Sequence, residues 1–334
     1  MKGVRDLLIP GVFLAVSCNP ALASDVTVGC EGASGHYKYS SISAALTDLH
    51  AISHRDHAIT VSGTCAEAVR IDDFENLDLI GTAGAAIVDA TGTGSVLYIT
   101  ASKSISIRGF ALRGSGPRRA RVVTILDSTV NFEDCTIENG TQGVMAQGLS
   151  HVRFFSSVIQ NNQWFGIRVD DNSWLEVENV SIQGNWSGIR VNRSKATILG
   201  AVLIQNNTAN GILVQQGAAL FYSDADLPEQ KVFTNGSVGI KVETGGKLEM
   251  CGPALIEGNP RAGIELIDSS AKLFCTNQTI RGNGTAGNPL TGGIIALGNS
   301  HADLYNAEVV ENSGSGLVVR ENSSVRIVTN TTIT

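Results

Sequence analysis

Residues 159–191 read IQNNQWFGIRVDDNSWLEVENVSIQGNWSGIRV, and this stretch decides the fold. It contains the pattern Ile-x-(Asn/Gly)-Asn, a short linker, Gly-Ile-Arg-Val, and then an alternating segment, Trp174 to Glu178, before the pattern begins again at Ile182. Alternation of apolar and polar residues with period 2 predicts β-strands with one face inward and one outward. Each unit therefore contains short strands joined by turns rich in Asn and Gly.

The tetrapeptide Gly-apolar-x-apolar recurs along the chain, and five of the seven steps between its glycines are 22–24 residues long. The two longer steps contain insertions rich in loop-forming residues, at 223–229 and 284–289. One unit is too small to bury its own apolar face, so successive units are expected to stack as coils about 4.8 Å apart, with their turn asparagines forming a ladder. The repeat glycines are Gly143, Gly166, Gly188, Gly211, Gly239, Gly263, Gly293 and Gly316.

This repeat resembles the right-handed parallel β-helix family, the architecture of pectate-lyase-like and mannuronan-epimerase-like proteins. The clear resemblance covers about residues 122–330 and extends more weakly to about residue 60. It implies an all-β, right-handed, single-stranded parallel β-helix, a solenoid over residues 61–334 with roughly 11–12 coils, the last one incomplete. The repeat specifies architecture far more than activity, because function resides in sites built onto a fold.

The N-terminal region has a different character. Lys2 and Arg5 precede an apolar run at 7–16 and the small-x-small pattern at 21–23, so residues 1–23 are interpreted as an export signal. The run is shorter than the ~20 residues needed to cross a bilayer. An N-terminal anchor and lipidation at Cys18 remain open alternatives. Export would place the mature chain, without a transmembrane segment, in the periplasm, outside the cell or on its surface.

Residues 24–60 are interpreted as a cap for the first coil. The segment Ser40 to Leu49 has apolar residues at helical spacing and serine at the expected N-cap, which predicts a short amphipathic helix. Cys30 and Cys65 flank this helix, and in an oxidising compartment we predict a disulfide between them.

The overall composition excludes some functions. The net charge is −7 and charged residues make up 16% of the chain, which argues against nucleic acid as a partner. Aromatic residues are only 5%, so the core is expected to consist of Val, Ile, Leu and Ala. The absence of a CxxC motif argues against a zinc site.

The resemblance also suggests where chemistry could occur. In the family, the x of Gly-Ile-x-Val points outward, and epimerase-like members carry Asp there with His two residues later. Here Arg168 and Asp170 stand at those positions, and no coil carries the histidine. Pectate-lyase-like members use acidic residues for Ca²⁺ and an arginine as base. The candidate catalytic residues are therefore Arg168, Asp170, Asp171 and Arg190, with Asp170 and Asp171 as a weak Ca²⁺ pair.

Three interpretations of this surface remain open. The polar residues can form a solvated ladder, or they can belong to a non-catalytic exported protein that binds an acidic polysaccharide or envelope glycan. Alternatively, the chain is a polysaccharide lyase or uronate C5-epimerase, and only this reading calls for a cofactor, Ca²⁺. The planar guanidinium of arginine presents several N–H donors that fit anionic oxygens. The candidate glycan-binding residues are Arg168, Arg190, Lys241, Glu265, Arg118 and Arg119.

The remaining cysteines and the C-terminal end give two further expectations. Counting eight residues back from the turn asparagines places Cys251 and Cys275 on one core-facing rung, where two thiols are favoured over a bridge. Cys135 is expected to be a buried free thiol. Ile333 should precede an asparagine turn, so the sequence stops within a coil. Three alternatives remain open for this end. The sequence is a fragment of a longer β-helix, the uncapped coil associates end to end with a second copy, or the last coil frays.

Overall fold

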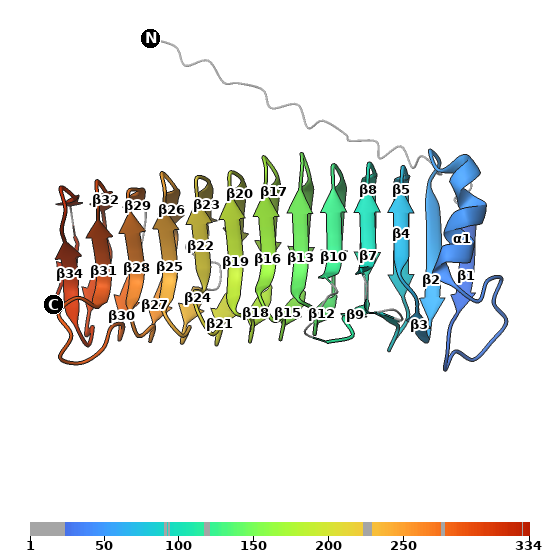
Figure 1. Ribbon diagram of the computed structural model, residues 1–334, viewed down its shortest axis with the longest axis horizontal. Coiled ribbons are helices and arrows are strands. Elements are labelled where there is room, and N and C mark those ends of the chain that lie inside the picture. Colours follow the sequence, from blue (N-terminus) through green and yellow to red (C-terminus); the bar gives the residue numbers. More distant parts are fainter. Residues whose placement is uncertain are drawn as a thin grey trace, which may run out of the picture.

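The computed structural model describes residues 24–89, 92, 94–116, 121–222, 229–274, 278–328 and 330–334. Within these residues the strands form three parallel sheets of 13, 12 and 11 strands, here called sheets A, B and C. Figure 1 shows the coils stacked in chain order along one axis, with the one α-helix among the described residues at the N-terminal end. The predicted fold class, an all-β parallel solenoid with a short N-terminal helix, is confirmed.

A typical coil contributes one strand to each sheet, in the order C, A, B. Sheet A contains β1 Ser24–Gly29, β2 His57–Ser62, β5 Glu75–Gly81, β8 Lys103–Arg108, β11 Thr129–Glu133, β14 His151–Phe155, β17 Trp174–Glu178, β20 Lys195–Leu199, β23 Ala218–Tyr222, β26 Lys247–Cys251, β29 Ser270–Phe274, β32 His301–Leu304 and β35 Ser324–Ile327. Sheet B contains β3 Thr64–Ala66, β6 Ala86–Val88, β9 Ala111–Arg113, β12 Thr136–Glu138, β15 Val158–Gln160, β18 Ser181–Gln183, β21 Leu203–Gln205, β24 Gln230–Phe233, β27 Ala254–Glu257, β30 Gln278–Arg281, β33 Ala307–Val310 and β36 Thr332–Ile333. Sheet C contains β4 Val69–Asp72, β7 Ser95–Thr100, β10 Arg121–Leu126, β13 Gln142–Gln147, β16 Phe165–Asp170, β19 Ser187–Asn192, β22 Ile212–Gln215, β25 Val238–Glu243, β28 Ala262–Ile267, β31 Gly292–Leu297 and β34 Ser315–Val319.

The core is a continuous column of aliphatic side chains. In β16, for example, Ile167 and Val169 are fully buried while Arg168 between them faces outward. The aromatic rings in this column are few, and Phe132 and Phe154 stack in adjacent coils with centroids 4.8 Å apart. The low aromatic content read from the sequence therefore matches a core built mainly from β-branched residues and leucine.

The predicted asparagine ladder is present and buried. Each Nδ2 except that of the last member, Asn312, donates to the Oδ1 of the asparagine in the next coil, at 2.9–3.2 Å. Each Oδ1 after the first also accepts the backbone N–H of the preceding asparagine. The ladder therefore satisfies the buried backbone N–H at one turn of each coil from Asn162 to Asn283. Its members are Asn162, Asn185, Asn207, Asn235, Asn259, Asn283 and Asn312.

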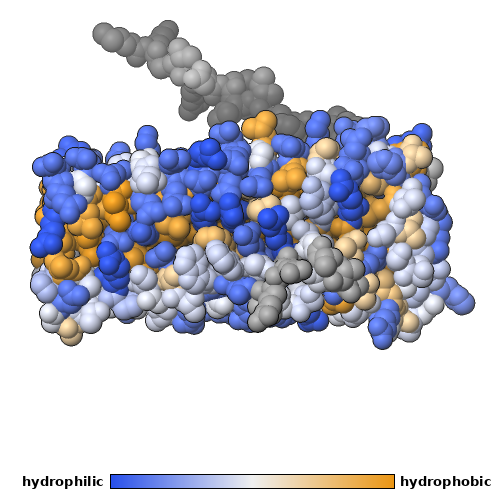
Figure 2. Space-filling view, in the orientation of Figure 1, coloured by the Kyte–Doolittle hydropathy of each residue, from blue (hydrophilic) through white to orange (hydrophobic). Residues whose placement is uncertain are grey.

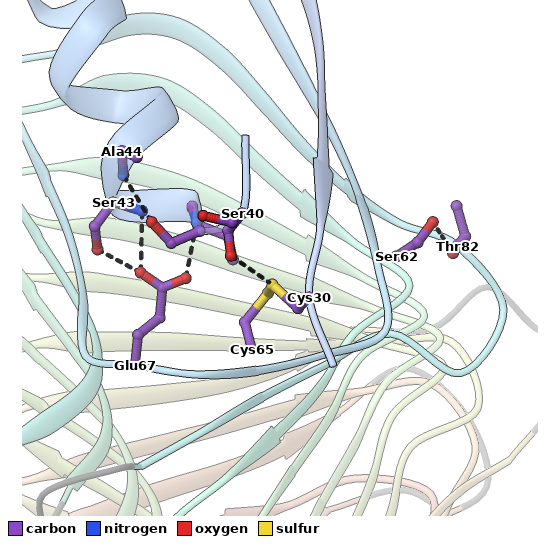
Figure 3. The surroundings of a disulfide bond; sticks show 10 residues. Cys30, Ser40, Ser43, Ala44, Ser62, Cys65, Glu67 and Thr82 are labelled. Atoms are coloured by element: carbon purple, nitrogen blue, oxygen red, sulfur yellow. Dashed lines mark hydrogen bonds between the residues drawn. A yellow bond between two sulfur atoms is a disulfide. The ribbon is translucent and has the colours of Figure 1, made fainter. Parts of the chain in front are cut away.

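The N-terminal cap is helix α1, Ile42–Leu49, followed by the 3₁₀-helix η1, His50–Ile52. Its apolar side, including Leu46, is buried against the first coils, as the spacing predicts. The Cys30–Cys65 disulfide is confirmed and lies beside the start of the helix (Figure 3). Figure 3 also shows Glu67, whose carboxylate accepts hydrogen bonds from the backbone N–H groups of Ile42 and Ser43 at 2.7 and 3.0 Å.

Replacing Glu67 with alanine is expected to lower the free energy of unfolding by about 1–2 kcal/mol. The carboxylate satisfies two helix N-terminal N–H groups and complements the positive end of the helix dipole. Chemical denaturation measures the change, with Glu31→Ala as the control because Glu31 is exposed and makes no side-chain bond to α1. An unchanged midpoint for Glu67→Ala would show that the contact contributes nothing to the cap.

The cysteine expectations were only partly correct. Cys135 is a buried free thiol as predicted, and burial raises its pKa to about 11. Cys251, however, is disulfide-bonded, so the expectation of a free thiol is wrong for this residue; Cys275 lies outside the described residues. The expected core-facing rung is also wrong, because Cys251 pairs in register with Phe274 and with exposed Tyr222 on the outer side of sheet A.

Two further expectations concern the ends of the chain. Ile333 lies in β36 opposite Val309, at the position before an asparagine turn, as the repeat predicts. End-to-end association through this coil stays a prediction. The proposed export signal, residues 1–23, lies outside the described residues. In the part of the chain that the structure describes, no helix has the length and apolarity needed to cross a membrane.

Candidate functional site on the outer face of sheet C

The outer face of sheet C brings three of the predicted site residues together. β16 and β19 are parallel neighbours, and their register places Arg168 opposite Arg190 and Asp170 opposite Asn192. The residues between them, such as Val169 and Val191, are fully buried in the core. The strand alternation therefore projects both arginines and Asp170 from one surface.

Asp170 is a buried carboxylate with one unused oxygen. Its Oδ2 accepts a hydrogen bond from Arg168 Nε at 2.5 Å, and its side chain is only 2% exposed. Its Oδ1 is also buried and has no hydrogen-bond partner. A buried carboxylate oxygen without a donor is unfavourable, and because this atom is covered, the group of the pair that faces a ligand is the 27% exposed side chain of Arg168.

Arg190 carries a positive charge that no carboxylate contacts. Its Nε donates to the neutral amide Oε1 of Gln215 at 2.9 Å, and no ion pair involves it among the described residues. Burial, followed by repulsion from Arg168, lowers the pKa of Arg190, and Asp170 and Glu243 offset only part of this. The guanidinium also lies 5.5 Å from the ring centroid of Phe165. Its terminal nitrogens are therefore available to an anion.

The other predicted site residues of this face that the structure describes, Lys241 and Glu265, are already matched. Lys241 Nζ lies 2.7 Å from Glu243 Oε2, and Gln215 Nε2 donates to Glu243 Oε1 at 2.7 Å. Burial tends to raise the pKa of Glu243, but the hydrogen bonds from Lys241 and Gln215 outweigh it and hold the pKa below its ordinary value. Glu265 is buried and paired with Arg261. Lys241 and Glu265 thus differ from Arg190, because each has a partner of opposite charge.

Two exposed tryptophans at the edge of this face were missed in the sequence. Trp164 and Trp186 are 51% and 44% exposed, and their ring centroids lie 6.2 Å apart. Trp186 also meets Phe165 edge-on at 5.5 Å, which connects the tryptophans to Arg190. Each tryptophan stands two residues before a repeat glycine, a regularity that was available in the sequence. Exposed aromatic rings beside polar groups are typical of ligand sites.

Asp171 does not join this site. It lies in the turn after β16 with φ +57°, and its Oδ1 pairs with Arg193 at 2.5 Å. Within the described ranges, no group of three or more potential metal ligands includes Asp170 or Asp171; the group that does occur consists of the disulfide cysteines Cys30 and Cys65 with Glu67. Arg118 and Arg119 lie outside the described residues.

Polar and apolar side chains separate along this face. Figure 2 shows hydrophilic residues over the middle of the face and apolar ones gathered over β28, β31 and β34. The apolar cluster contains Val238, Ala262, Ile295 and Val318, with Leu297 packed against it. The unmatched Arg190 and the exposed tryptophans therefore lie on the polar side of this boundary.

Comparisons with known proteins agree with this architecture. The family described as "Right handed beta helix region" matches residues 54–209 and 95–250. Tailspike protein 2 of Escherichia coli O157:H7 bacteriophage CAB120 has a similar structure, with a TM-score of 0.64 and 12% identity over 92% of this chain. That match covers 46% of the tailspike, so the chain spans about half its length.

Other solved structures are less similar. Pectate lyase Pel9A has a TM-score of 0.49 and 11% identity, covering 94% of this chain and 79% of that protein. The A-module of mannuronan C-5 epimerase AlgE4 from Azotobacter vinelandii has a TM-score of 0.46 and 12% identity, with coverages of 88% and 94%. No curated protein matches by sequence. At 12% identity the likeness to the tailspike shows a shared fold and nothing about activity.

Proposed function

The chain belongs to the right-handed β-helix family, and we propose that this member is an exported, non-catalytic protein that binds an acidic glycan at β16 and β19. The observation that carries the proposal is the unmatched charge of Arg190. A guanidinium presents a planar fork of N–H donors that fits a carboxylate. A uronate is a sugar with such a carboxylate, so acidic polysaccharides are the partner class.

The groups around Arg190 suit the remainder of a sugar. The rings of Trp164 and Trp186 offer exposed apolar faces against which the C–H face of a pyranose can pack. On the other side, Arg168 is held on the same face by its hydrogen bond to Asp170 Oδ2, and its other N–H groups can donate to sugar oxygens. From Phe165 to Asp170 the site spans about 16 Å along the strand, at about 3.3 Å per residue, which accommodates several sugar units.

A binding screen tests this proposal. The purified chain is titrated calorimetrically with alginate and polygalacturonate oligosaccharides, and with neutral gluco-oligosaccharides for comparison. Binding of acidic but not neutral sugars is expected, and it should weaken with salt. Parallel reactions, with and without Ca²⁺, are monitored for the ultraviolet absorbance of an unsaturated uronate and for C5 epimerisation by NMR. Turnover in either reaction would establish the enzymatic alternative and contradict a non-catalytic role.

Replacing Trp186 with alanine is expected to weaken binding of acidic oligosaccharides by roughly two- to tenfold, the range for loss of one aromatic packing partner. Phe155→Ala is the matched control, because Phe155 is a partly exposed aromatic on the outer side of sheet A. Equal affinities for the two variants would remove the tryptophans from the site. Circular dichroism verifies that both variants are folded.

A further inference from the structure

A shallow hollow of about 510 Å³ lies where the turns lead from sheet C into sheet A. The register of sheet A aligns Ala218 with Lys195 on one side and with Lys247 on the other. A small side chain therefore stands between two long cationic ones. Gly217 and Gly245, which have no side chain, line the same edge and leave the space open.

Both lysines of the hollow have charges that no carboxylate neutralises. Neither forms an ion pair in the part of the chain that the structure describes, whereas the neighbouring Arg193 is already paired with Asp171. At about 4.8 Å per coil, the Cα atoms of Lys195 and Lys247 lie about 10 Å apart. This separation allows both ammonium groups to approach one anionic group above Ala218.

The ammonium group of Lys195 is held in place by an aromatic stack. Its Nζ lies 5.1 Å from the ring centroid of Trp174, whose other face stacks on His151 with centroids 4.6 Å apart. Trp174 Nε1 donates to Thr197 Oγ1 at 3.2 Å, which fixes the indole. A cation held over a fixed ring loses less side-chain entropy when it binds an anion.

The hollow adjoins the site on sheet C. Asp170 and Asn192 end β16 and β19, and the turn residues that follow them, Asn172 and Arg193, line the hollow. A ligand that extends beyond Asp170 in the strand direction therefore reaches the lysines after one turn.

We propose that Lys195 and Lys247 bind a second carboxylate of the same acidic glycan, a step that rests on the proposed function of the sheet C site. The glycan then follows the direction of the strands, from Trp186 over Arg190 and around the turn to the hollow. It does not run parallel to the solenoid axis. The hollow consequently selects for oligosaccharides longer than the two or three sugars that contact Arg190.

A length series of uronate oligosaccharides tests this inference. Affinity is measured calorimetrically for the disaccharide through the hexasaccharide, with the wild-type chain and with the double variant Lys195→Gln/Lys247→Gln. The wild-type affinity is expected to rise with length, and the double variant to bind the hexasaccharide roughly two- to fivefold more weakly while binding the disaccharide normally. Lys272→Gln is the control, because Lys272 also lies over an aromatic ring on sheet A but outside the hollow.

The outcomes separate the two proposals. If the wild-type chain binds no uronate of any length, the proposed function fails and the hollow has no glycan to extend. If the disaccharide binds but the double variant retains the full hexasaccharide affinity, only the inference about the hollow is overturned. An equal loss with Lys272→Gln would show a general effect of surface charge and would also overturn it.

Discussion

Replacing Asn207 with leucine is expected to lower the free energy of unfolding by about 4 kcal/mol. Asn207 Oδ1 accepts from the backbone N–H and the Nδ2 of Asn185, while its Nδ2 donates to Ile182 O and to Asn235 Oδ1. Leucine has a similar size but removes all four bonds. The partners stay buried without donors or acceptors, and each such group costs about 1–3 kcal/mol, part of which relaxation recovers.

Urea denaturation followed by circular dichroism measures this loss. Asn131→Leu is the matched control, because Asn131 lies on the exposed outer side of β11 and its substitution should change the stability by less than about 0.5 kcal/mol. Hydrogen exchange adds a local readout, since the amides of Asn185 and its neighbours should exchange faster. Similar stability losses for the two variants would mean that the ladder satisfies the turn without stabilising it.

The repeat made the fold predictable because two constraints agree in every coil that carries a ladder asparagine. The alternation around Ile167 decides which side chains face the core, and the turn asparagine provides the hydrogen bonds that close the coil. These features are local, so each can be recognised within one unit of sequence. Their repetition every 22–24 residues then determines the stacking, because only in-register stacking buries all the apolar faces together.

The error over Cys251 shows where this reasoning fails. Val177 lies eight residues before its ladder asparagine, but its register partner Ile198 lies nine residues before Asn207. The turn after β20 is one residue longer, and a shift of one residue moves a side chain to the opposite face of a sheet. Counting from the asparagine therefore placed Cys251 in the core, although strand pairing places it on the outside.

The candidate site was only half predictable for a related reason. The outward position of Arg168, Asp170 and Arg190 follows from the alternation. Which charges are neutralised depends on side-chain conformations within and between coils, and the period carries no information about these. Arg168 turns along its own strand to Asp170, whereas Arg190 reaches across to Gln215 and keeps its charge unmatched.

Replacing Arg190 with glutamine is expected to weaken binding of acidic oligosaccharides by about 10- to 100-fold. Hydrogen bonds to a charged group contribute about 1.5–3 kcal/mol, and this site is partly shielded from solvent. The folded chain should not be destabilised, because the variant removes a partly buried cation that Arg168 repels. Binding is measured by calorimetry with uronate oligosaccharides, and stability by thermal unfolding.

The combination of lost affinity with retained stability distinguishes a binding residue from a structural one. Arg281→Gln is the control, since Arg281 is paired with Glu257 on sheet B and its loss should leave the affinity unchanged. Arg190→Lys keeps the charge but not the planar fork, so it should recover only part of the affinity if two carboxylate oxygens are bound together. Full recovery with lysine would mean that the site attracts anions as a point charge. If Arg190→Gln unfolded at a lower temperature and bound normally, the unmatched guanidinium would have a structural role, and the glycan would have to bind elsewhere on the solenoid.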